Sequence, residues 1–156
     1  MKSRIVAGVV AGIIAGVVFG MMMTMMSAPT PEGGSMPMMG MVAMVVGSTS
    51  LVVGWLYHLF NSVVIGAIFG GALGGRAGSY GSGIGLGAVY GFVWWILGGL
   101  ILMPMMLGMP MFAPLMMAPM RMIAMASLVG HLIFGVILGG AYVMLFRRSS
   151  DASPAD

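Results

Sequence analysis

The chain has 156 residues, of which 60% are hydrophobic and only 6% are charged, and its mean hydropathy is +1.12. So few charges cannot cover the apolar surface of a soluble domain of this length, which excludes a soluble globular protein. The net charge of +3 comes from six basic and three acidic residues. We interpret it as a signal of membrane topology, and we expect the lipid bilayer as the partner and no nucleic acid.

Four apolar stretches are long enough to cross a hydrocarbon core of about 30 Å as helices. They cover residues 5–26, 51–73, 82–103 and 122–146. The first begins like a signal peptide, but it has no small-residue cleavage site, so we expect an uncleaved helix. We therefore predict an all-α membrane protein with one bundle of four transmembrane helices over residues 1–146, followed by a disordered cytoplasmic tail over residues 147–156.

The basic residues indicate which way the bundle faces. Five of the six lie on one side of the predicted spans: Lys2, Arg4, Arg76, Arg147 and Arg148. Positive charge collects on the cytoplasmic side of membrane proteins. We therefore expect a multi-pass protein of the plasma (inner) membrane with both termini in the cytoplasm and with the segments 27–50 and 104–121 on the outer face.

The two halves of the chain resemble each other. A shift of 73 positions places Met36-Pro37-Met38 on Met109-Pro110-Met111 and His58 on His131, and a shift of 75 superposes the glycines at 8, 12 and 16 on those at 83, 87 and 91. This pattern predicts two parallel two-helix repeats, 5–73 and 82–146, related by an axis along the membrane normal. Glycines four residues apart allow close helix packing, and a glycine face left over could serve a homodimer or a larger membrane complex.

Each half carries a segment that cannot belong to one straight membrane helix. A helix over residues 38–73 would be about 54 Å long, so we expect a break at Gly47-Ser48-Thr49-Ser50, where hydroxyls can cap the next helix. In the second half four prolines between residues 104 and 119 prevent a continuous helix. Both segments are rich in Met and Pro and are expected to lie against the outer end of the bundle.

Methionine is concentrated in these segments. Twenty of the 22 methionines fall in residues 21–44 and 103–125, while the chain contains no cysteine. Thioether sulfur is a soft donor that suits Cu(I) and Ag(I), and unlike a thiol it cannot form a disulfide on an oxidising outer face. The alternative is that Met serves as an adaptable apolar filler or partner surface. The candidate metal ligands are Met21, Met22, Met25, Met26, Met36, Met38, Met39, Met41, Met44, Met109, Met111, Met116, Met117 and Met120.

His58 and His131 are the only histidines, and ionisable residues inside membrane spans are functional candidates. Three interpretations stay open: the imidazoles complete a Met-lined metal path, they are the two axial ligands of a haem b, or they form hydrogen bonds between helices. The neighbouring Trp94 and Trp95 would pack against the histidine helices or stack on a cofactor. The spacing alone does not decide between these roles, or whether any cofactor is bound.

The sequence offers little for catalysis. Glu32 is the only carboxylate before the tail, which holds Asp151 and Asp156. An acid/base pair inside the bundle is therefore missing from the sequence. We predict a protein that is not an enzyme and has no catalytic residues.

The chain shows two resemblances, of which the first supports the topology. The motifs Leu102-Met103-Pro104-Met105-Met106 and His131-Leu132-Ile133-Phe134-Gly135, together with the twin halves, resemble those of small Met-rich four-span membrane proteins of bacteria and archaea, a resemblance that implies no activity. The pairing of an MxxxM motif at Met21 and Met25 with a GxxxG motif at Gly12 and Gly16 is loosely similar to that in eukaryotic-type copper transporters, which have three spans.

The leading hypothesis is a membrane protein that binds a soft metal ion, Cu(I), at its outer Met clusters for transport or for hand-over to a partner. The first alternative is a non-catalytic small subunit or assembly factor of a membrane complex. The second alternative is a bis-histidine haem b protein.

Overall fold

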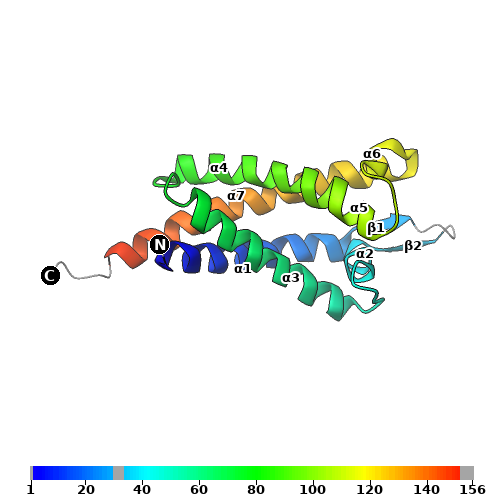
Figure 1. Ribbon diagram of the computed structural model, residues 1–156, viewed down its shortest axis with the longest axis horizontal. Coiled ribbons are helices and arrows are strands. Elements are labelled where there is room, and N and C mark those ends of the chain that lie inside the picture. Colours follow the sequence, from blue (N-terminus) through cyan, green and yellow to red (C-terminus); the bar gives the residue numbers. More distant parts are fainter. Residues whose placement is uncertain (1, 30–33, 152–156) are drawn as a thin grey trace.

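The computed structural model describes residues 2–29 and 34–151 and is mostly helical (Figure 1). The long helices are α1 (Lys2–Met25), α3 (Leu51–Ile68), α4 (Tyr80–Trp94) and α7 (Arg121–Asp151). Two π-helical segments, η1 (Phe69–Leu73) and η2 (Trp95–Leu102), extend α3 and α4. The shorter elements are β1 (Ser27–Pro29), β2 (Ser35–Pro37), α2 (Met38–Met44), α5 (Met103–Met106), α6 (Ala113–Met116) and the 3₁₀ segment η3 (Ala118–Met120).

Within the described residues, four helices are long and apolar enough to cross a membrane, as predicted. They cover Arg4–Met25, Leu51–Leu73, Tyr80–Met106 and Ala118–Arg147. The third is longer than predicted because the helical backbone continues past Leu102 into α5, where Pro104 stands in the first turn. Because proline has no amide to donate to the carbonyl of Leu100 four residues earlier, that carbonyl instead accepts from the amide of Phe112 at 2.7 Å.

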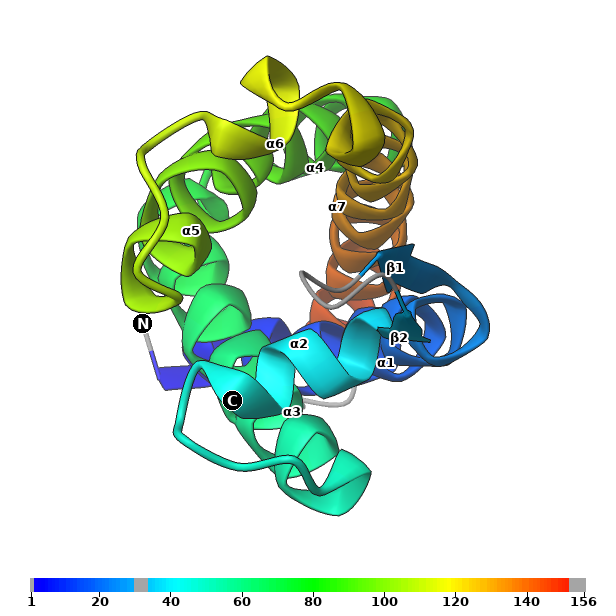
Figure 2. The same ribbon diagram turned by 90° about the vertical axis from the view of Figure 1, so that its right-hand side faces the viewer.

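The long helices form two hairpins that pack against each other. In the first hairpin α1 packs on α3, in the second α4 packs on α7, and the contact between α1 and α7 joins the two. Figure 2 shows the resulting order in space, α3, α1, α7 and α4, viewed from the end that carries α2, α5 and α6. The relation of the two hairpins as sequence repeats stays a prediction.

Backbone-to-backbone packing holds each hairpin together, as the glycine spacing predicts. A Cβ added at Gly8 of α1 would overlap the carbonyl oxygen of Gly66 on α3. In the second hairpin a Cβ added at Gly87 of α4 would overlap the carbonyl oxygen of Gly135 on α7. The same overlap with backbone occurs along these two seams at Gly12, Gly70, Gly91 and Gly139.

A second stripe on α1 turns toward the other hairpin. Ala7, Ala11 and Ala15 are buried one position before the glycines, and Phe19 and Met23 continue the same four-residue spacing. The Phe19 ring packs closely on Gly130 and lies 6.3 Å from the ring of Phe134, both on α7. Helix α1 therefore has a glycine face for α3 and an adjacent face of Ala, Phe and Met for α7.

Both Met-rich segments lie at one end of the bundle, which we call the methionine end (Figure 1). It carries α2, α5, α6 and the two short strands, whereas the start of α1, the end of α7 and the turn that joins η1 to α4 lie at the opposite end. The predicted break after α2 is present. Gly47 there has a φ of +72°, which glycine adopts without strain.

Two details of the prediction were wrong. The fold is not entirely helical, since β1 and β2, which follow α1 in the chain, pair antiparallel. No hydroxyl caps α3. Instead the amide of Ser50 donates to Oγ of Ser48 at 3.1 Å.

Helix α7 continues to Asp151, and the disorder predicted for residues 147–156 stays a prediction. The chain has no Gly or Pro between Tyr142 and Ser153 to end the helix, and arginines near a helix C-terminus interact favourably with its dipole. Arg147 also donates to the carbonyl of Gly78 at 3.1 Å. Residues 152–156 lie outside the described part of the chain.

Candidate functional site

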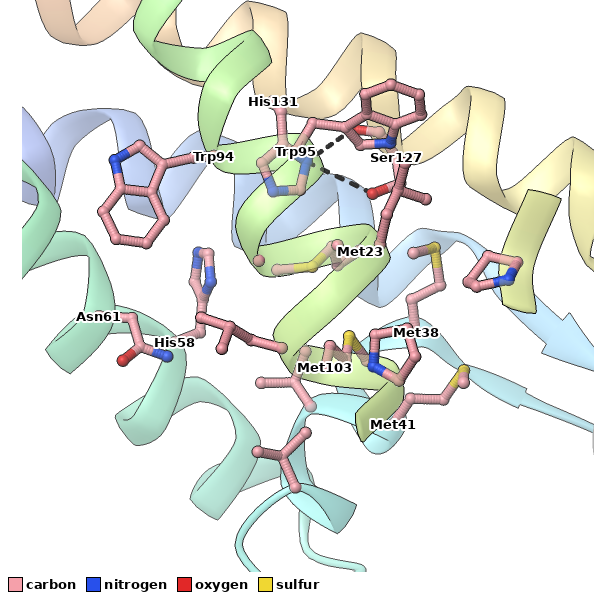
Figure 3. Close-up of a pocket in the computed structure, with 18 of the residues that line it drawn as sticks. Met23, Met38, Met41, His58, Asn61, Trp94, Trp95, Met103, Ser127 and His131 are labelled. Atoms are coloured by element: carbon pink, nitrogen blue, oxygen red, sulfur yellow. Dashed lines mark hydrogen bonds between the residues drawn. The ribbon is translucent and has the colours of Figure 1, made fainter. Parts of the chain in front are cut away.

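A cavity of about 270 Å³ lies between the two hairpins at the methionine end. Its walls come from α1 to α7 together with η2 and η3, and they are mainly apolar. Figure 3 shows the labelled Met23, Met38, Met41 and Met103 side chains reaching into this space from α1, α2 and α5. Both histidines of the chain line the same cavity.

Seven thioethers line the cavity. Four belong to methionines that the sequence singled out, namely Met38, Met41, Met109 and Met120. The prediction missed the other three, Met23, Met103 and Met106. For Met23 a signal existed, because it follows Phe19 by four residues on the buried face of α1.

The other predicted methionines do not line the cavity. Met39 is fully buried under α3, with its carbonyl oxygen against Gly54, while Met25 is 86% exposed and Met116 is 72% exposed. The remaining ones outside its walls are Met21, Met22, Met26, Met36, Met44, Met111 and Met117. The structure thus brings together a subset of the predicted ligands and spreads the rest over the methionine end.

His58 projects from α3 toward α1 and is buried. Its Nε2 lies 2.8 Å from the carbonyl oxygen of Gly16. A carbonyl only accepts hydrogen bonds, so Nε2 carries the proton and Nδ1 of the neutral ring keeps a free lone pair. One turn later the hydroxyl of Ser62 donates to the carbonyl oxygen of His58 at 2.9 Å, which places the small side chain of Ser62 against Gly16.

His131 has the opposite arrangement on α7. Its Nδ1 lies 2.8 Å from the carbonyl oxygen of Ser127 and 3.3 Å from the hydroxyl of the same residue. Because the carbonyl can only accept, Nδ1 is the donor and Nε2 keeps the free lone pair. Each imidazole therefore has one nitrogen fixed by backbone and one that no described residue occupies.

Phe19 links the two histidines. Its ring centroid lies 5.7 Å from that of His58 and 4.8 Å from that of His131, edge-on in both cases. Because both imidazoles contact one ring, they lie at a similar level of the bundle, as the repeat pattern predicts. A haem held between them would have to displace Phe19, so the haem hypothesis receives no geometric support.

The two tryptophans of the third span have different roles. Trp95 is buried, and its indole Nε1 donates to the carbonyl oxygen of Ala124 on α7 at 3.1 Å. It therefore packs against the helix of His131, one of the two roles that the sequence left open. Trp94 lines the cavity on the side of α3, and its ring lies 6.1 Å from that of Tyr90 (Figure 3).

The cavity offers soft and neutral donors. Among the described residues, no lining side chain is charged, and no three His, Cys, Asp or Glu side chains come together as a metal site. Glu32 lies outside the described residues. A metal ion in this cavity would therefore rest on thioethers and imidazoles, the donor set that suits Cu(I) and Ag(I).

Comparison of the chain with protein-family models, with curated proteins and with solved structures found no match. The function must therefore be inferred from the geometry of the cavity and from the distribution of residues at the methionine end.

Proposed function

We propose that this protein binds a soft monovalent cation, Cu(I) or Ag(I), in the cavity, for transport across the membrane or for hand-over to a partner. The observation that carries the proposal is the meeting of seven thioethers and two imidazoles in one space between the hairpins. Residues from both Met-rich windows contribute, although more than 50 positions without methionine separate the windows in the sequence.

The histidine geometry supports this proposal. Histidines that bind metals usually donate their other ring N–H to a carboxylate, a backbone carbonyl or water, which fixes the ring and leaves the second nitrogen for the metal. His58 and His131 donate in this way to Gly16 and Ser127. Both rings are thus already held in a tautomer that leaves one nitrogen free for a cation.

The charge of the cavity favours a monovalent ion. The Born cost of moving an ion out of water rises with the square of its charge, and no described lining side chain is anionic to compensate for that cost. Cu(I) and Ag(I) carry a single charge and accept neutral sulfur ligands. A divalent ion such as Zn²⁺ would lack both the anionic partners and the harder donors that it prefers.

The proposal is tested by metal retention in purified protein. The cavity variant replaces Met23, Met38 and Met103 by Leu, and the control variant replaces the exposed Met25, Met116 and Met122 by Leu. Met-to-Leu changes conserve volume, so the fold should survive in both. After a challenge with Ag(I) or Cu(I), elemental analysis should find near-stoichiometric metal in the wild type and the control, and little in the cavity variant. Equal retention in all three proteins would refute the site.

We further propose that the methionine end faces the outside of the plasma (inner) membrane and that both termini are cytoplasmic, on the strength of the positive charges at the opposite end. The chain has no cysteine, so single cysteines report topology cleanly. A membrane-impermeant maleimide on intact cells should label Thr49→Cys at the methionine end and leave Gly78→Cys unlabelled. The reverse labelling pattern would show that the methionine end faces the cytoplasm.

A second function is favoured by the exposed methionines of this end. Met25, Met122 and Met116 are 86%, 83% and 72% exposed, and flexible thioether side chains suit adaptable contacts with a partner protein. In that case the protein is a non-catalytic small subunit or assembly factor. A partner that co-purifies stoichiometrically without metal, and is lost from the control variant above, would establish this function.

That the protein is not an enzyme stays a prediction.

A further inference from the structure

The cavity has a side opening between α3 and the third span. These two helices are joined by the turn after η1, and Figure 1 shows them diverging from that turn toward the methionine end. Their backbones stay apart along most of their length. The hydroxyl of Tyr90, ten residues after the start of α4, bridges them by donating to the carbonyl oxygen of Ile65 at 2.8 Å.

Beyond this bridge the wall of the cavity is incomplete. Val64 and Leu102 line the cavity and are also 40% and 49% exposed. Gly98 lines it too, and a Cβ added there would meet nothing within 4 Å. We call this gap the lateral opening; its rim is formed by Tyr57, Asn61, Val64, Trp94, Gly98 and Leu102.

The lateral opening lies at the depth of the hydrocarbon core. Asn61 is ten residues from the start of α3, which places it about 15 Å below the methionine end of that helix, near the middle of the span. Whatever enters here comes from the lipid phase, so it must be uncharged and soluble in the membrane.

Four polar groups of the cavity have no partner among the described residues. Two lie at the rim, the hydroxyl of Tyr57 and the side-chain amide of Asn61, and the other two are Nδ1 of His58 and Nε2 of His131. Polar groups without a hydrogen bond are costly at this depth. The two imidazole nitrogens can only accept, whereas the amide and the phenolic hydroxyl can donate and accept, so a hydroxyl group matches all four.

We propose that the lateral opening admits a membrane-dissolved alcohol or phenol whose apolar body lies against Trp94 and whose hydroxyl donates to a histidine nitrogen. The lining supports this assignment because it is apolar and aromatic except for these polar groups. The proposal goes beyond metal binding and does not depend on it, since metal-free protein is used to test it and metal retention is measured separately.

The probe is a diazirine-bearing octanol added to metal-free protein in lipid vesicles, with its methyl ether as the matched probe that lacks the hydroxyl donor. After illumination, peptide mapping by mass spectrometry locates the adducts. The exposed residues Leu56, Phe60 and Val89 report contact with probe in the surrounding lipid. Trp95 and His58 are 8% and 9% exposed, so adducts on them report entry into the cavity.

Two variants test the route of entry. Gly98→Phe fills the lateral opening, and Gly85→Phe places the same side chain on the same helix at an open position outside the cavity. We expect octanol adducts on Trp95 and His58 in the wild type and in Gly85→Phe, and their loss in Gly98→Phe. The ether should label these two residues about fivefold less, the effect of one lost hydrogen bond. Labelling of the three exposed residues should be unchanged throughout.

Several results would overturn the proposal. Adducts confined to the exposed residues would mean that the cavity is closed to the bilayer. Equal labelling by the ether would remove the role of the hydroxyl, and entry that persists in Gly98→Phe would place the route elsewhere. If Gly98→Phe is not monodisperse, Gly98→Leu serves as the smaller plug.

Discussion

The glycine seam between α4 and α7 makes a quantitative prediction about two neighbouring residues. Gly87 lies in the seam, where a Cβ would overlap the carbonyl oxygen of Gly135 and lie 3.1 Å from the amide nitrogen of Gly139. Gly85 lies on the open side of the same helix, where a Cβ would meet nothing within 4 Å. The variants Gly87→Ala and Gly85→Ala therefore make the same chemical change in opposite surroundings.

The expected magnitudes follow from this difference. In a helix interior Ala is favoured over Gly by about 0.8–1 kcal/mol, a gain that both variants share. In Gly87→Ala the atoms that must move are backbone, so the two helices have to separate, and overpacking of this kind costs about 1–3 kcal/mol. Because the propensity gain cancels, the difference in unfolding free energy between the variants should itself be about 1–3 kcal/mol, with Gly85→Ala the more stable.

The assay is equilibrium unfolding in mixed micelles with an increasing fraction of SDS, followed by tryptophan fluorescence. A difference of 1.4 kcal/mol corresponds to about tenfold in the equilibrium constant, which such curves resolve. If the two variants unfold at the same fraction of SDS, the close approach of α4 and α7 does not contribute to stability. The interpretation of the glycine spacing would then be refuted.

Four further predictions use the same protein. Phe19→Ala should lower the unfolding free energy by about 3–5 kcal/mol in the same assay, because it removes a buried ring. Tyr90→Phe should lower the unfolding free energy by about 1 kcal/mol in this assay, because the hydrogen bond from its hydroxyl to Ile65 is lost. An unchanged unfolding free energy would show that this hydrogen bond is not formed. Gly47→Ala should lower the unfolding free energy by about 1–2 kcal/mol in the same assay, because residue 47 has a left-handed backbone conformation that alanine adopts only with strain. In a silver titration His131→Leu should bind at least about tenfold more weakly than the wild type, and equal affinity would remove this ligand.

The sequence predicted the architecture well because its signals are strong in a membrane. Four long apolar stretches have few other ways to fold in a bilayer, and glycines at four-residue spacing mark the contact face of a helix. The alignment of His58 with His131 correctly predicted a similar depth for both. The sequence also placed the Met-rich segments together, because each segment follows a span that runs toward the same end of the bundle.

The sequence could not predict which methionines of the Met-rich segments line the cavity. The spacing of Met21 and Met25 correctly describes one face of α1, but which face meets α7 depends on how the whole helix is rotated. That rotation follows from the alanine stripe, which carries Met23 inward and leaves Met25 exposed. In the second segment the chain between Met106 and Met120 forms only short helical turns, whose directions depend on tertiary contacts. The spacing of residues in the sequence therefore does not predict which side chains share a face there.

The unequal exposure of the methionines has a chemical consequence. Oxidation converts a thioether to a sulfoxide, which is polar and chiral and is no longer a flexible apolar side chain. Met25, Met116 and Met122 stand at the surface of the methionine end, whereas Met23 and Met38 are 5% and 6% exposed. An oxidant that reaches this end therefore meets the exposed sulfurs first. They would be consumed as sacrificial scavengers, and the thioethers of the cavity would outlast them.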